Sequence, residues 1–178
     1  MYLQIVYGAL IAVTLIAAVT DLRTGLIPNA LTLPALVLAV ALHGILVSPL
    51  AAGLSLLGAL LCGLTPFVFF RLGAMGGGDV KLFAALGAIA GPGLGLEIQL
   101  LSLTAAFIYG LCVMTFRGKL LATLRNVGRV FVGIFWPPAR ARREQDAPEL
   151  TSLRIGAAIF AGAALAVGNR MVFGGFTP

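Results

Sequence analysis

Long apolar runs, separated by short breaks that contain charges, proline or glycine, make up most of the sequence. A helix that crosses a membrane needs roughly 20 apolar residues in a row. The pattern therefore predicts an all-α protein with about six transmembrane helices. Five of the predicted helices cover residues 3–20, 30–47, 50–70, 98–116 and 155–172, and a further apolar run starts at Val80.

The run that starts at Val80 is unusually short. It meets Gly91-Pro92-Gly93 after a stretch of roughly 16 Å at 1.5 Å per residue, against a hydrocarbon layer of roughly 30 Å. Two interpretations follow. Either this helix continues through Pro92 towards Leu96, or its start lies below the membrane surface.

The composition excludes an ordinary soluble domain. Hydrophobic residues make up 60% and charged residues 10% of the 178 positions, and the mean hydropathy is +1.07. We expect one membrane-embedded domain over residues 1–178, with the lipid bilayer around it. No Lys or Arg precedes the first run, so we expect a retained first helix rather than a cleaved signal peptide.

The positive charges predict the orientation of the helices. The formal net charge is +6. If successive loops alternate between the two sides of the membrane, only Arg170 of the twelve basic residues falls on one side, and the rest share the other. That basic side is cytoplasmic by the positive-inside rule, which places both termini outside the cytoplasm. Since orientation accounts for the charge, we expect no nucleic-acid partner.

The longest stretch between predicted helices, residues 117–153, is also the most basic. Within it, apolar residues alternate with Arg125 and Arg129 on one helical face, as in an amphipathic helix that lies on a membrane. We expect a basic cytoplasmic segment here. Its charges either orient the protein or contact a substrate directly.

Two aspartates interrupt the apolar pattern. Asp21 closes the first run, and Asp79 follows three glycines in residues 75–81, with the sequence MGGGDVK. A charged side chain inside a bilayer costs several kcal/mol, so such an acid indicates a functional site. The predicted topology places both acids at the cytoplasmic face, and we predict that they form a pair. We also expect residues 21–30 to form a loop, in which Asn29 caps the next helix with Thr32 at the third position.

Paired carboxyl groups favour the chemistry of an aspartic protease. Two close carboxyl groups share a proton, so one activates a water while the protonated one polarises a carbonyl. The chain offers no competing set of nucleophile, base or metal ligands, and we expect no metal and no cofactor. We interpret the isolated His43 as a packed or interfacial residue, Cys62 and Cys112 as small core residues, and Glu97 as a solvated residue of the outer side.

The residues beside Asp79 suggest how a peptide binds. Gly76, Gly77 and Gly78 lack side chains, which would let a substrate backbone approach in an extended form, although a flexible loop has the same composition. Lys81 either pairs with a substrate carboxylate, tunes the aspartate pair, or is an ordinary cytoplasmic anchor.

Small residues also recur every fourth position, as at Ala59/Gly63, Ala84/Ala88, Gly87/Gly91 and Ala158/Gly162, which favours close helix packing in lipid.

Taken together, these motifs resemble those of the type IV prepilin peptidases, which are GxGD intramembrane aspartyl proteases. The resemblance rests on Asp21 with the downstream Ile27-Pro28-Asn29, and on Gly76-Gly77-Gly78-Asp79 about sixty residues later. It covers the chain through the fifth predicted helix.

The resemblance implies a multi-pass peptidase of the bacterial inner membrane that removes the leader of type IV prepilins at the cytoplasmic face, with Asp21 and Asp79 as the catalytic pair. The chain lacks the preceding domain with paired cysteines found in larger members. It is therefore similar to the short branch associated with tight-adherence (Flp-type) pili, and we expect no methyltransferase activity.

Three alternatives remain at this point. A small proton- or ion-coupled transporter would use the same acids, but would place them near the membrane midplane. An assembly subunit of a secretion machine would bind partners without cleaving them. A relative of signal peptide peptidase would share the GxGD acid but carry a different first motif.

Overall fold

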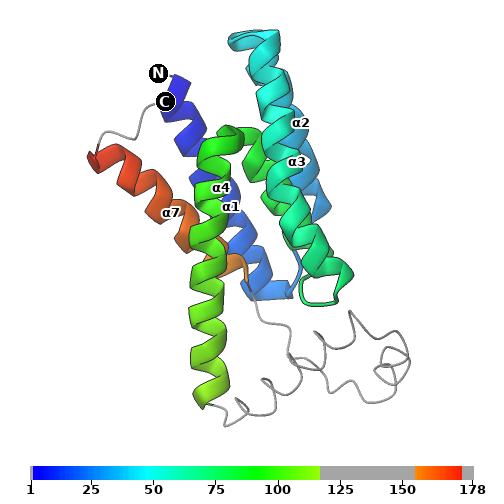
Figure 1. Cartoon of the computed structure of the whole chain (residues 1–178), viewed down its shortest axis with the longest axis vertical. Helices are drawn as coiled ribbons and strands as arrows, with labels where there is room; N and C mark the ends of the chain where they lie inside the picture. The colour runs from blue at the N-terminus through cyan, green and yellow to red at the C-terminus, as the bar shows by residue number, and fades with distance from the viewer. Residues whose placement is uncertain (1, 117–154, 174–178) are drawn as a thin grey trace. The chain divides into compact units, whose positions relative to one another are not determined.

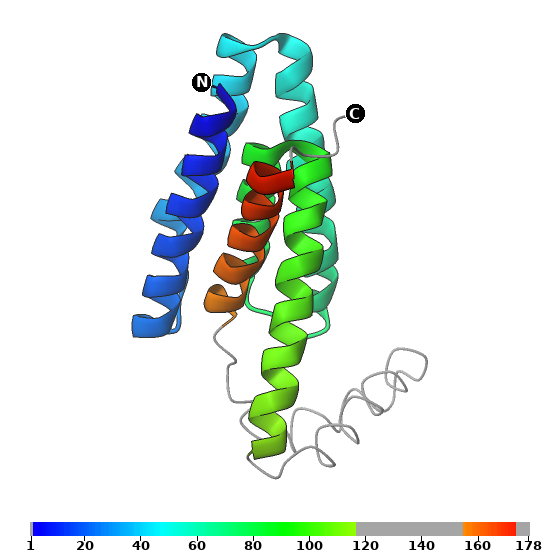
Figure 2. The same cartoon turned by 90° about the vertical axis from the view of Figure 1, so that its left-hand side faces the viewer.

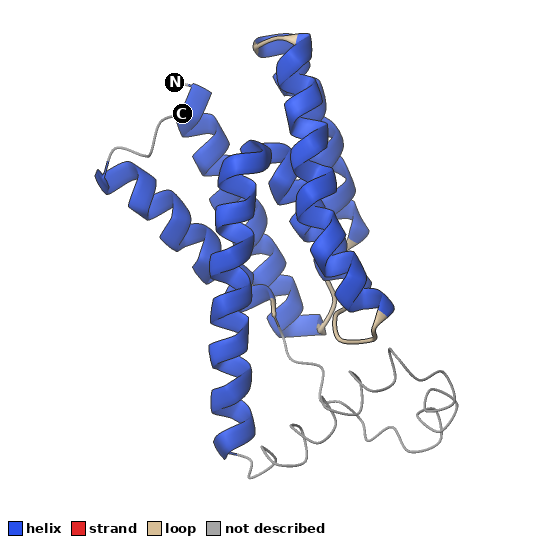
Figure 3. Cartoon of the chain, viewed as in Figure 1, coloured by secondary structure: helices blue, strands red, loops and turns tan. Residues whose placement is uncertain are grey.

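The computed structural model describes residues 2–116 and 155–173, and these residues form helices joined by short loops (Figure 3). Helix α1 covers Tyr2–Thr24, α2 covers Asn29–Leu46, α3 covers Pro49–Arg71, α4 covers Gly77–Phe116 and α7 covers Gly156–Phe173. No strand occurs in these two ranges. The predicted all-α class is confirmed, and most predicted helix ends lie within a few residues of the observed ones.

Four of these helices, α1 to α4, are long and apolar enough to cross a membrane, and α7 is a shorter apolar helix. The described residues thus provide four to five helices able to span a bilayer. The count of six spans and the outward termini stay predictions. The predicted amphipathic segment at residues 117–153 lies outside the described residues.

The chain divides into two compact units, one made of residues 1–106 with 154–178 and the other of residues 107–153. Every contact described below lies within the first unit. Of the second unit, the described part is the end of α4, residues 107–116, which is helical.

Helix α4 reverses direction at Gly91. Gly91 has φ 73° and ψ 178°, a backbone conformation that glycine adopts readily and other residues rarely do. A Cβ on Gly95 would lie 3.0 Å from the Cα of Gly87, which is possible only if the chain folds back. Figure 1 shows the two arms of α4 in green. The first arm, residues 77–90, is roughly 21 Å long, so the interpretation of one helix that continues through Pro92 is wrong, and the alternative, that its start lies below the membrane surface, stays a prediction.

Close backbone contact joins α3 to the first arm of α4. A side chain on Gly87 would collide with the backbone of Gly58, and a Cβ on Gly63 would lie 3.3 Å from the Cβ of Ala84. Small residues allow the two backbones to approach closely. In lipid, where the hydrophobic effect does not hold helices together, such close packing stabilises the bundle. The prediction of close packing through small residues is confirmed for these helices.

Two prolines explain the polar contacts between α3 and the two arms of α4. Pro66 has no N–H, so the carbonyl of Cys62 one turn earlier lacks its helical donor, and the Gln99 side chain donates to it instead at 3.0 Å. Pro92 likewise leaves the carbonyl of Ala88 free, and the Ser55 hydroxyl donates to it at 2.7 Å. An unpaired carbonyl inside a membrane costs several kcal/mol, so these side chains make the helix breaks tolerable.

Helix α7 packs along α1 and against the second arm of α4 (Figure 2). Ser102 donates to the carbonyl of Ile159 at 3.3 Å, and a Cβ on Gly162 would collide with Ser102. At the other end of α7, Arg170 donates through two nitrogens to one oxygen of Glu97. The prediction that Glu97 is merely solvated is wrong, because this ion pair holds it against α7.

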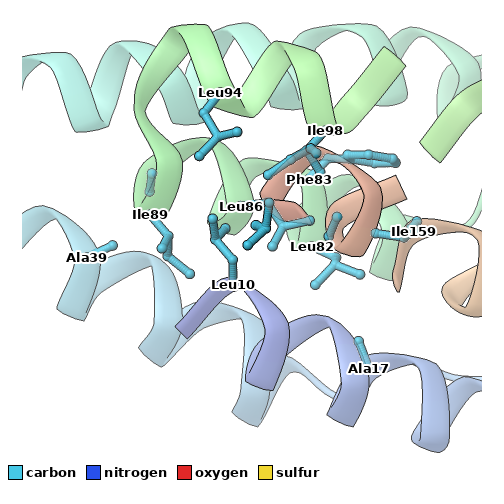
Figure 4. Close-up of a cluster of buried hydrophobic side chains, with 14 of the residues drawn as sticks. Leu10, Ala17, Ala39, Leu82, Phe83, Leu86, Ile89, Leu94, Ile98 and Ile159 are labelled. Atoms are coloured by element: carbon cyan, nitrogen blue, oxygen red, sulfur yellow. The ribbon is translucent and has the colours of Figure 1, made fainter. Parts of the chain in front are cut away.

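The first arm of α4 supplies much of the apolar core, as Figure 4 shows. Leu82, Phe83 and Leu86 are almost completely buried, together with Leu10 of α1 and Ile159 of α7. Large apolar residues on the outer faces of α2 and α3 are exposed instead, which suits a protein solvated by lipid. Cys62 is buried, as predicted, whereas Cys112 is exposed, so the prediction that it is a core residue is wrong.

Candidate functional site

Asp21 lies on the last part of α1, which continues to Thr24. The prediction that the first helix ends at Thr20 and leaves Asp21 in a loop is therefore wrong. The residue is buried, with 7% of its surface exposed. The helix continues because no proline or glycine interrupts it before Gly25. The Gly25 N–H still donates to the carbonyl of Asp21 at 2.8 Å. A helical backbone fixes the direction of the Asp21 side chain more firmly than a loop would.

The carboxylate of Asp21 accepts a hydrogen bond from the first residue of α7. The N–H of Gly156 lies 2.9 Å from Asp21 Oδ2, and the bond is buried. The first N–H groups of a helix have no partner within the helix and favour a negative group. Sequence reasoning missed Gly156, since no motif links it to Asp21. The only available signal was a glycine at the start of the last apolar run.

Asp79 lies in the first turn of α4, which begins at Gly77 rather than at Val80 as predicted. Its Oδ2 accepts a hydrogen bond from the N–H of Gly76 at 3.3 Å. The acid thus caps the start of its own helix, which explains why the helix begins ahead of it. The preceding helix, α3, ends in a Schellman motif in which Gly73, with φ 72°, turns the chain towards this site.

The loop after Asp21 packs directly against the first turn of α4, which carries Asp79. A Cβ on Gly78 would lie 3.1 Å from the Cβ of Ile27. One turn further on, Lys81 Nζ donates to Asn29 Oδ1 at 2.8 Å. Residues from both predicted motifs therefore meet at this end of the helices. Ile27 occupies the space that a side chain on Gly78 would need, so packing also favours glycine at this position.

The structure corrects the predicted cap of α2. Pro28 occupies the N-cap position, without a side-chain hydrogen bond to the helix, and Asn29 is already helical. The side chain of Asn29 bonds to Lys81 instead. The Thr32 hydroxyl is buried and has no hydrogen-bond partner among the described residues. Proline at the preceding position accounts for the difference, since its fixed φ prepares the helix start without a polar cap.

The contacts of Ile27 with Gly78 and of Lys81 with Asn29 bring the segments that carry Asp21 and Asp79 to the same end of the helices, and the pairing of the two carboxyl groups stays a prediction. Each accepts a backbone N–H at the start of a helix, Asp21 from Gly156 and Asp79 from Gly76. Among the residues that the structure describes, neither aspartate forms an ion pair with Lys or Arg.

The remaining residues predicted to bind substrate lie around Asp79. Gly76 is exposed, and a Cβ on it would lie 3.2 Å from Asp79 Oδ2. Gly77 is half-buried and faces the ring of Phe70 at 3.5 Å. Their role in binding a peptide stays a prediction. In the described ranges no group of three or more His, Cys, Asp or Glu side chains is placed to hold a metal ion.

His43 lies away from these residues, at the end of α2. Its Nδ1 is 2.7 Å from the carbonyl oxygen of Ala39, and its ring contacts the ring of Tyr2 edge-on with centroids 5.7 Å apart. The interpretation of His43 as a packed residue is confirmed.

Comparison with protein families gives one match, to the type IV leader peptidase family, over residues 8–113. Comparisons with curated proteins and with solved structures gave no significant match. The matched residues make up more than half of the chain and include both aspartates and the loops that follow and precede them. The chain therefore belongs to the type IV leader peptidase family.

Proposed function

We propose that this protein is an intramembrane aspartyl endopeptidase that removes the leader of type IV prepilins at the cytoplasmic membrane face, with Asp21 and Asp79 as the catalytic pair. Membership of the family implies cleavage of prepilin leader peptides. The observation that supports the rest is the contact between the two motifs: Ile27 packs against Gly78, and Lys81 bonds to Asn29.

In the proposed reaction the two carboxyl groups hold one proton between them. The ionised member takes a proton from water as the water oxygen bonds to the scissile carbonyl carbon. The protonated member gives its proton to the carbonyl oxygen. The tetrahedral intermediate then collapses: one of its hydroxyl groups returns a proton to the carboxylate that had donated it, the carbon–nitrogen bond breaks, and the leaving amine takes up the proton that came from water. No cofactor is needed for this cycle.

The substrate and location are proposed on the same basis. The distribution of basic residues supports a cytoplasmic site, outward termini and about six spans, in the bacterial inner membrane. The resemblance to the short branch supports a Flp-type prepilin. Gly76, Gly77, Gly78 and Lys81 would line the path of the peptide next to Asp79. Four to five apolar helices and the family match indicate a multi-pass membrane protein, and the match gives no support to the transporter alternative.

The test is cleavage of a Flp-type prepilin in detergent by the wild type and by the Asp21→Asn and Asp79→Asn variants. Loss of the leader is read by mass, and folding is checked by thermal unfolding. We expect cleavage by the wild type and none by either variant, at similar melting temperatures. Turnover near the wild-type rate by one variant would remove that aspartate from the mechanism. Failure to cleave several prepilins, with ion flux in liposomes that depends on both acids, would refute the proposed function.

A further inference from the structure

We propose that Gly156, the first residue of α7, is a positioning residue for Asp21. Its backbone N–H orients the carboxylate, and its missing side chain leaves room for that carboxylate. This inference rests on the proposed function. It does not follow from the family match, which ends at residue 113 and so does not include α7.

The contact between Gly156 and Asp21 is short, buried and joins distant parts of the chain. The N–H of Gly156 lies 2.9 Å from Oδ2 of Asp21, which is 135 residues earlier. Asp21 is 7% exposed, so water offers little competition for this bond.

The space beside Gly156 is filled by Asp21 itself. A Cβ on Gly156 would lie 2.8 Å from the Cβ of Asp21 and 2.9 Å from its Oδ2, which is closer than such atoms approach. Even alanine would therefore push the carboxylate aside. Glycine is required here by the side chain opposite and not by a turn.

Helix α7 is fixed along its length, which makes its first amide a rigid support. Ser102 donates to the carbonyl of Ile159, one turn after Gly156, and the Arg170–Glu97 ion pair holds the far end. Catalytic groups keep a productive geometry when the residues that hold them are themselves locked in place. The amide of Gly156 meets this condition.

The test compares three glycines of α7. Gly156→Ala places a methyl group against Asp21. Gly162→Ala disturbs packing against Ser102, away from the acids, and at Gly168 a Cβ meets nothing within 4 Å. We expect Gly156→Ala to lower kcat roughly tenfold to a hundredfold with KM within about twofold, because small displacements of a catalytic group are costly. Gly162→Ala should lower the melting temperature and leave kcat per folded molecule near the wild-type value, and Gly168→Ala should change neither.

A second measurement needs no activity and therefore separates this inference from the proposed function. The shifts in melting temperature of Gly156→Ala, Asp21→Ala and the double variant form a cycle. We expect the double variant to be more stable than the sum of the single effects, since Asp21→Ala removes Oδ2 and Cγ, two of the three nearest atoms, and leaves only the contact with Cβ. Additive shifts would overturn the contact, as would a wild-type kcat for Gly156→Ala or an equal loss of kcat in Gly162→Ala. If the wild type cleaves no prepilin, the proposed function fails and the catalytic role fails with it, whatever the cycle shows.

Discussion

Among the described residues, the acidic side chains are held in two different ways at the two ends of α7. Near the start of α7, Asp21 and Asp79 accept hydrogen bonds only from backbone amides among the described residues. Near its end, Glu97 is neutralised by two nitrogens of Arg170. The nearby cation, Lys81, bonds to Asn29 and to neither aspartate. An amide orients a carboxyl group without neutralising it, so the first end keeps acids available for proton transfer while the second uses its acid for cohesion.

The largest effect should come from lengthening an acid at the first end. Asp79→Glu keeps a carboxyl group but moves it away from the Gly76 amide by one methylene. We expect kcat to fall roughly a hundredfold, since a displacement near 1 Å costs about that much. Steady-state cleavage of a prepilin gives the measurement. The matched change, Glu97→Asp, should leave kcat near the wild-type value, and an equal fall in both would erase the contrast between the two ends.

A smaller effect on stability should come from breaking the ion pair at the second end. Glu97→Gln leaves the half-buried Arg170 without its charged partner, and we expect a loss of about 1–2 kcal/mol of unfolding free energy. Urea unfolding in detergent measures it. Catalysis per folded molecule should persist. A control, Arg170→Met, should cost a similar amount, and the double variant should cost less than the two singles combined. Full additivity would show that the pair contributes nothing.

Next in size is the effect of filling the contact between the two loops. Gly78→Ala puts a methyl group 3.1 Å from the Cβ of Ile27, so the loops must separate by a few tenths of an ångström. We expect kcat/KM to fall roughly threefold to tenfold, because this separation moves Asp79 relative to Asp21. Gly77→Ala meets the Phe70 ring at 3.5 Å, an ordinary contact, and should cost less. The reverse order would favour direct contact between Gly77 and the substrate.

The smallest effect should come from the Lys81–Asn29 hydrogen bond. Lys81→Met removes the donor at an exposed position, where such a bond contributes less than about 1 kcal/mol, so kcat/KM should fall about threefold. Asn29→Ala should have the same effect, and the double variant should be no worse than either. If Lys81→Met is far more damaging than Asn29→Ala, Lys81 contacts the substrate or the aspartates and not only Asn29.

Local pattern predicted much of this protein because membranes impose simple rules on a sequence. The helices appeared as apolar runs, and their observed ends differ by only a few residues from the expected ones at α2, α3 and α7. The meeting of the two acidic motifs at one end of the helices followed from the cost of the acids in lipid and from the distribution of basic residues. The glycines that form close contacts, such as Gly63 with Ala84, were visible in their four-residue spacing.

The errors share a physical cause: each concerns a polar residue whose hydrogen-bond partner lies far away in the sequence. The helix around Asp21 was ended too early because a charged residue reads as a loop, while the helical backbone tolerates it where Gly156 offers a donor. Asn29 looked like a cap, but a cation from another helix competed for its side chain. Glu97 looked solvated because Arg170 lies 73 residues away.

By itself, the sequence determined that the chain is a bundle of apolar helices with two acidic motifs, since desolvation acts on each residue according to its own chemistry. The tertiary structure alone decided which partners those residues have. It reversed α4 at Gly91, paired Glu97 with Arg170, and placed the first amide of α7 on Asp21. These contacts join distant segments, and they depend on where the fold places each donor and acceptor. Local sequence patterns, such as the spacing of apolar residues, therefore do not predict them.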